Sequence, residues 1–301
     1  MSSQADSVKS ILYALVANMA IAVAKLAGAI HTGSAAMLAE AIHSFADCGN
    51  QGLLLYGLKV AKRPPSPDHP LGYGKAIYFW SFIVALILFS MGGLFSMYEG
   101  IHKLSATDPI SAPWVAVGIL TFGIIAESFS LYGCLREINK VRGGRSLWRW
   151  FRDSRQSELI VILGEDIAAL FGLVFALVAI LVTVVTGDPI FDAIGSIAIG
   201  VLLLLVAVGI GIEVKDLLIG QSVETADRDL IHKFISDHQE VAKVMNLITL
   251  QLGDGIMVAV KAEMRASETK LLIENINDVE KRLRERFPGI RWIFFEPDVA
   301  D

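Results

Sequence analysis

His43 and Asp47, two residue types that commonly bind metal ions, lie four positions apart in a mainly apolar stretch of the chain. Side chains four residues apart on a helix project from the same face. Imidazole and carboxylate groups together suit a divalent transition metal, zinc in particular, and a tetrahedral zinc site needs about four such ligands. The spacing therefore predicts one part of a metal site on a helical face.

Three more acidic residues lie in other apolar stretches, namely Glu127, Glu165 and Asp166. An ionisable side chain near the middle of a membrane costs roughly 2.5–3.5 kcal/mol on insertion scales, so each one requires a partner or a function. From the helical rise, Asp47 lies roughly 20 Å from the outer end of its helix and Asp166 about 14 Å from the inner end of its own. Antiparallel helices would bring the two residues together near the midplane.

Other interpretations of the charged residues stay open. The midplane groups could form a polar network that only holds helices together. Four further charges lie within about two turns of an outer helix end, where local pairing or extension toward the lipid headgroups is expected. They are Lys25, Glu40, Glu99 and Asp192.

Six stretches of about 20 mostly apolar residues could position these groups as membrane-spanning helices. They are residues 11–30, 35–58, 77–101, 114–135, 159–185 and 190–214. Hydrophobic residues make up 54% of the chain and charged residues only 19%, against about 25% charged residues in a soluble domain. The composition excludes a soluble or disordered protein, and no long basic run indicates a nucleic-acid partner.

The distribution of Lys and Arg predicts the orientation in the membrane. With six spans, both termini lie on one side, and thirteen basic residues fall on that side against Lys103 alone on the other. The thirteen are Lys9, Lys59, Lys62, Arg63, Lys75, Arg136, Lys140, Arg142, Arg145, Arg149, Arg152, Arg155 and Lys215. We therefore expect cytoplasmic termini. No transit-like leader precedes the first stretch, which favours a bacterial inner membrane over the mitochondrial inner membrane.

Residues 220–301 have a different composition, with 11 of the 26 basic and 15 of the 31 acidic residues. The pattern predicts a six-helix transmembrane domain over residues 1–219 and a small cytoplasmic α+β domain over residues 220–301. In the second domain we expect a helix (227–237), two strands (245–252 and 256–264), a helix (271–287) and a strand (290–295). His232 and His238 are six residues apart, so we interpret them as surface histidines rather than a regulatory metal site.

Several motifs together resemble the cation diffusion facilitator family over essentially the whole chain. They are GSAAMLAE at 33–40, HSFAD at 43–47 and HPLGYGK at 69–75, and DCGNQG at 47–52 with LGED at 163–166 most resembles the branch that includes the mitochondrial zinc transporter of animals. The resemblance implies a homodimer with an αββαβ, ferredoxin-like tail that exports zinc in exchange for protons and has no prosthetic group. It also implies that His43, Asp47 and Asp166 are metal ligands.

The sequence departs from the family pattern at Ile162, where most members have a histidine ligand. Glu165 could replace this ligand, as could an amide oxygen of Asn50 or Gln51. More oxygen ligands would favour manganese, iron or cobalt over zinc.

Two functions of other classes are alternatives to transport. An intramembrane metallohydrolase would need an open coordination position and a general base, and no His-Glu-x-x-His motif is present in any of the six stretches. A subunit that binds metal without transporting it, or that uses its acids only to pair helices, is the other alternative. We therefore expect a transporter and not an enzyme, with the divalent ion, protons and the bilayer as its partners.

Overall fold

The computed structural model describes residues 18–105, 112–266 and 268–300. The chain divides into two compact units, which are described separately. The first consists of Met1–Tyr56, Trp80–Leu147 and Glu158–Glu213, and the second of Gly57–Phe79, Trp148–Ser157 and Val214–Asp301.

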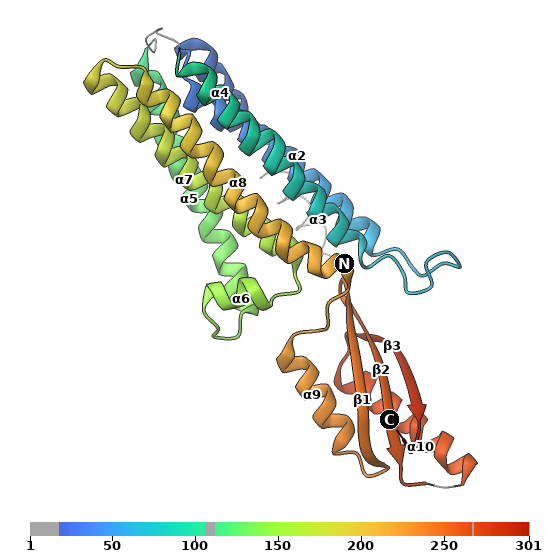
Figure 1. Cartoon of the computed structure of the whole chain (residues 1–301). Coiled ribbons are helices and arrows are strands. Elements are labelled where there is room, and N and C mark those ends of the chain that lie inside the picture. The colour runs from blue at the N-terminus through green and yellow to red at the C-terminus, as the bar shows by residue number, and fades with distance from the viewer. Residues whose placement is uncertain (1–17, 106–111, 267, 301) are drawn as a thin grey trace, which may run out of the picture. The chain divides into compact units, whose positions relative to one another are not determined.

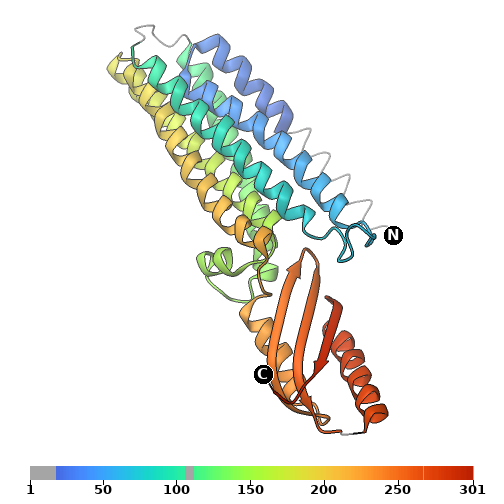
Figure 2. The same cartoon turned by 45° about the vertical axis from the view of Figure 1, so that its right-hand side comes forward.

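Long helices running side by side make up the first unit (Figures 1 and 2). Residues 18–32 are helical, and the labelled elements that follow are α2 (Ala35–Ala61), α3 (Ala76–Ile87), the π-helical η1 (Leu88–Leu94), α4 (Phe95–Lys103), α5 (Pro113–Val141), α7 (Ser157–Thr186) and α8 (Ile190–Ile219). α3, η1 and α4 form one continuous helix.

Within the described residues, four helical spans are long and apolar enough to cross a membrane: Ala76–Lys103, Pro113–Val141, Ser157–Thr186 and Ile190–Ile219. α2 has a similar length, 27 residues, but contains the polar residues that the sequence singled out as candidate ligands. The first expected span is described only from residue 18. The predicted class, a helical membrane protein with a small α+β domain, is confirmed.

Residues of two other segments hold the start of α2 in place. The Ser34 hydroxyl and the Ala35 N–H donate hydrogen bonds to the two carboxylate oxygens of Asp192 on α8, each at 2.5 Å. Ser34 also accepts a hydrogen bond from the Met37 N–H at 3.1 Å, as a helix N-cap does. Lys103 at the end of α4 donates to the Gly33 carbonyl. These contacts fix the depth and direction of the helix that carries His43.

Small residues let α4 and α8 approach closely. A Cβ on Gly100 would lie 2.6 Å from Cγ1 of Ile197, and a Cβ on Gly200 would lie 2.6 Å from Cγ of Met97. Close backbone approach at glycine is a usual way for helices to pack within a bilayer.

The second unit contains the C-terminal elements α9 (Thr225–Ser236), β1 (Val241–Leu252), β2 (Gly255–Met264), α10 (Thr269–Arg286) and β3 (Ile290–Pro297). The short helix α6 (Leu147–Asp153) also falls almost entirely within it. β2 lies between β1 and β3, antiparallel to β1 and parallel to β3 (Figure 2). The parallel pair requires the crossover that α10 supplies. The buried core of the C-terminal elements includes Ile235, Val258, Val260 and Leu283. The predicted order of helices and strands is confirmed.

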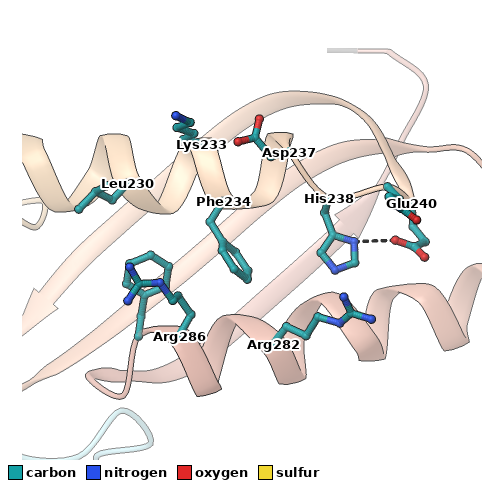
Figure 3. A pocket seen from close by; sticks show the side chains of 10 residues that line it. Leu230, Lys233, Phe234, Asp237, His238, Glu240, Arg282 and Arg286 are labelled. Carbon is teal, nitrogen blue, oxygen red and sulfur yellow. Dashed lines mark ion pairs between the residues drawn. The ribbon is translucent and has the colours of Figure 1, made fainter.

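The prediction that both tail histidines lie on the surface is wrong for His238. His232 is exposed, whereas the His238 side chain is only 6% exposed. Its Nδ1 lies 2.6 Å from Oε2 of Glu240 (Figure 3). Its Nε2 lies 3.8 Å from Oδ2 of Asp278 on α10. The turn from α9 into β1 folds the imidazole against the Phe234 ring, into a pocket of about 580 Å³ that is also lined by Arg282 and Arg286.

Candidate metal site

His43 and Asp47 share one face of α2, as their spacing predicts. Nε2 of His43 lies 3.5 Å from Oδ2 of Asp47. The His43 side chain is fully buried and that of Asp47 is 15% exposed. Two potential ligands therefore stand next to each other inside the helical unit.

α7 brings Glu165 to the same region. One turn beyond Asp47, Nδ2 of Asn50 donates a 2.6 Å hydrogen bond to Oε1 of Glu165. Asn50 is fully buried and Glu165 is 5% exposed. This bond shows that Glu165 faces α2 from α7, although it is rotated by about 100° from its neighbour Asp166.

Two residues of α5, Ser130 and Glu127, interact with the acidic residues of α7. The Ser130 hydroxyl donates a 3.1 Å hydrogen bond to Oδ1 of Asp166. Glu127, three residues earlier on α5, lies within electrostatic range of Asp47, Glu165 and Asp166. Ser130 was not among the residues expected at the site, although its spacing of three from Glu127 places both on one helical face and could have indicated it.

Several polar atoms at these positions are buried without a hydrogen bond in the described part of the chain. They are both ring nitrogens of His43, Oδ1 of Asp47, Oδ1 of Asn50 and Oδ2 of Asp166. An unsatisfied buried polar atom costs about 1–3 kcal/mol, and such atoms are few in native proteins. Their concentration on α2 and α7 is consistent with groups that bind a cation.

The structure does not gather every candidate into one ligand set. Within the described residues, no three His, Cys, Asp or Glu side chains are already close enough together to hold a metal ion. Gln51 follows Asn50 on α2 and is half-buried, with a direction about 100° away from that of Asn50. Binding of an ion would have to draw the α2 and α7 groups closer together.

The helical bundle and the polar groups buried inside it define a multi-pass membrane protein with a candidate ion-binding region. Residues 11–219 match the family described as the cation efflux transmembrane domain. The chain therefore belongs to the cation efflux, or cation diffusion facilitator, family, whose members transport cations rather than catalyse reactions.

Known proteins similar to this chain include two whose printed names refer to zinc or to metal tolerance. The human "Proton-coupled zinc antiporter SLC30A9, mitochondrial" is 32% identical over 237 residues, which cover 78% of this chain and 42% of the human protein. "Metal tolerance protein C4" of Arabidopsis thaliana is 29% identical over 226 residues, covering 74% of this chain and 50% of that protein. "Magnetosome protein MamB" of Magnetospira sp. (strain QH-2) is 28% identical over 252 residues, covering 81% and 80%. The chain thus spans half or less of the first two relatives. As expected, it is similar to the branch that includes the animal mitochondrial zinc transporter.

Proposed function

We propose that this protein is a proton-coupled antiporter that exports zinc, or a related divalent transition-metal ion, from the cytoplasm. The observation that carries the proposal is a set of nitrogen and oxygen atoms of His43, Asp47 and Asp166 that are buried without a hydrogen bond among the described residues, beside the Asn50–Glu165 hydrogen bond. The printed names of the human and plant relatives support metal transport, and that of the human relative supports zinc and proton coupling.

Competition between metal and protons supplies the coupling in this proposal. Imidazole and carboxylate groups must lose their protons before they coordinate a metal ion, so loading releases protons and protonation expels the metal. His43 binds through a ring nitrogen, and Asp47 and Asp166 bind through the oxygens that have no hydrogen bond. Glu165 supplies the ligand that Ile162 cannot, while the Asn50 amide holds its carboxylate in place.

The orientation and assembly are part of the same proposal. Thirteen basic residues on the side of the termini, against Lys103 on the other, support cytoplasmic termini. We propose that residues 220–301 form a dimerisation domain of a homodimer, and that residues 1–219 form the transport domain.

One set of observations favours a preference for manganese, iron or cobalt within the same architecture. Ile162 stands where the family resemblance implies an imidazole ligand, and the candidate groups other than His43 are oxygen donors. Oδ1 of Asn50 is buried without a hydrogen bond, and Glu165 adds a carboxylate. Hard oxygen ligands suit these ions better than additional nitrogen ligands would.

Alanine substitution of the two aspartates tests the site. In sealed vesicles that contain the reconstituted protein, Asp47→Ala and Asp166→Ala should each abolish zinc flux, while the variants remain folded because each change also removes a costly intramembrane charge. Asp153→Ala, which removes an aspartate of a largely exposed pair with Arg149, is the control and should transport as the wild type does. Wild-type flux in either Asp47→Ala or Asp166→Ala would show that the assigned site is wrong.

A further inference from the structure

A buried ion pair lies next to the candidate metal site and has no part in the transport scheme above. Nζ of Lys25, in the helical residues 18–32, lies 3.3 Å from Oε2 of Glu40 on α2 and donates a 2.7 Å hydrogen bond to the hydroxyl of Ser44. The side chains of Lys25 and Glu40 are both 0% exposed. A charge pair buried this completely carries a large desolvation cost, so its retention calls for a specific reason.

The contacts with Glu40 and Ser44 leave part of the hydrogen-bonding capacity of Lys25 and Glu40 unused. Oε1 of Glu40 is buried and has no hydrogen bond, and it lies where α7 leaves almost no space, since a Cβ on Gly172 would be 2.2 Å away. An ammonium group has three N–H donors, and the described residues give Lys25 two acceptors. The glutamate is therefore held by packing, while the ammonium keeps an unused donor.

Ser44, which accepts a hydrogen bond from the Lys25 ammonium, lies about one helical turn from the proposed ligand Asp47. Ser44 follows His43 directly, and Asp47 is three residues further along α2. Residues three apart on a helix have Cβ atoms about 5–6 Å apart. A lysine carries its charge on a flexible four-carbon stem, so the ammonium is free to change position around Ser44, which lies one helical turn from Asp47.

We propose that Lys25 is a tethered cation that competes with the transported metal for Asp47, and that Glu40 and Ser44 hold its ammonium away from the site when the metal is bound. This inference rests on the proposed metal-transport function. In the empty site the ammonium moves toward Asp47 and neutralises one of the carboxylates. Lys25 is thus a positioning residue that sets metal affinity and helps release, without itself touching the metal.

A double-substitution cycle on the full-length protein tests the competition. Zinc affinity is measured by calorimetry in detergent for the wild type, Glu40→Gln, Lys25→Gln and the double variant. Glu40→Gln frees the ammonium and should weaken zinc binding about 10-fold or more, a change of about 1.4 kcal/mol per tenfold. Lys25→Gln should bind zinc more tightly than the wild type. The double variant should match Lys25→Gln, because Glu40 has no effect once the competitor is gone.

Two other roles for the Lys25–Glu40 pair predict different zinc affinities in this cycle. If the two charges acted only through their fields, the effects would add and Glu40→Gln would still weaken binding in the Lys25→Gln background. If the pair were only structural, both single variants would weaken binding. Either pattern overturns the inference. Glu99→Gln, a charge-matched change on α4, is the control and should leave zinc affinity unchanged.

Two further measurements keep the test decisive. If Glu40→Gln does not fold, Ser44→Ala removes the 2.7 Å contact instead and should weaken zinc binding only when Lys25 is present. In vesicles, Lys25→Gln should lower both KM and kcat for zinc, because tighter binding slows release; unchanged constants contradict the inference. If the wild type binds zinc but the effects of Glu40→Gln and Lys25→Gln on affinity simply add in the double variant, only the role of Lys25 is refuted. If the wild type does not bind zinc, the proposed function itself is refuted.

Discussion

Replacement of Glu165 by Gln isolates the contribution of the residue proposed to replace the missing ligand at Ile162. Glu165 is 5% exposed, and its Oε1 accepts a 2.6 Å hydrogen bond from Asn50. Interactions of a buried charged group are worth about 1.5–3 kcal/mol each. Because about 1.4 kcal/mol corresponds to tenfold, loss of one carboxylate ligand should weaken zinc binding roughly 10- to 150-fold. Calorimetric titration of the detergent-solubilised protein with zinc measures this change directly.

The control for this experiment is Glu137→Gln on α5. Glu137 is 56% exposed and pairs with Lys140 at 2.5 Å, so its removal should leave zinc affinity unchanged. Unchanged affinity in Glu165→Gln would refute the ligand role. If the number of protons exchanged per zinc ion then changed, Glu165 would be a proton relay. The double substitution Ile162→His with Glu165→Ser restores the usual family pattern and should recover zinc binding.

Two more predictions concern ion choice and the position of α2. His43→Asp should shift transport preference from zinc toward manganese or cadmium, because a carboxylate replaces the imidazole; an unchanged selectivity across a panel of divalent ions would remove His43 from the ligand set. Asp192→Asn weakens the bonds that Ser34 and Ala35 donate and should destabilise the protein by about 1–2 kcal/mol, measured by thermal unfolding in detergent. An unchanged melting temperature in Asp192→Asn would contradict the role of Asp192 in holding the start of α2.

Local patterns predicted much of this fold. The two strands expected at 245–252 and 256–264 form the antiparallel hairpin of β1 and β2. The spacing of four between His43 and Asp47 was enough to place them on one face of α2. Such patterns repeat within a single element, so the sequence alone displays them.

Contacts between elements were harder to predict. Asn50 and Glu165 were each considered as a replacement ligand, but their hydrogen bond depends on how α7 is rotated against α2, which hydrophobic periodicity does not define. Lys25 and Glu40 were expected to pair locally or to extend toward the headgroups, and they pair with each other. The position of the Glu40 carboxylate requires the absence of a side chain at Gly172, where a Cβ would lie 2.2 Å from Oε1, and this is a property of the packed bundle.

The burial of His238 shows the same limit in the C-terminal elements. Its spacing of six residues from His232 argued against a shared metal site and favoured a surface position. Its surroundings include Glu240 at the start of β1 and Asp278 on α10, which approach only when the domain is folded. A pattern read along one helix does not contain that information.

Simultaneous measurement of zinc and proton movement in reconstituted vesicles tests the central proposal most directly. A proton gradient alone, without ATP, should drive zinc in the opposite direction, and a pH-sensitive dye should report the opposing proton flux. Lowering the pH on the loading side should reduce zinc flux, because protons compete for His43, Asp47 and Asp166. Zinc movement with no opposing proton signal at any imposed gradient would contradict antiport and indicate a uniporter or a channel.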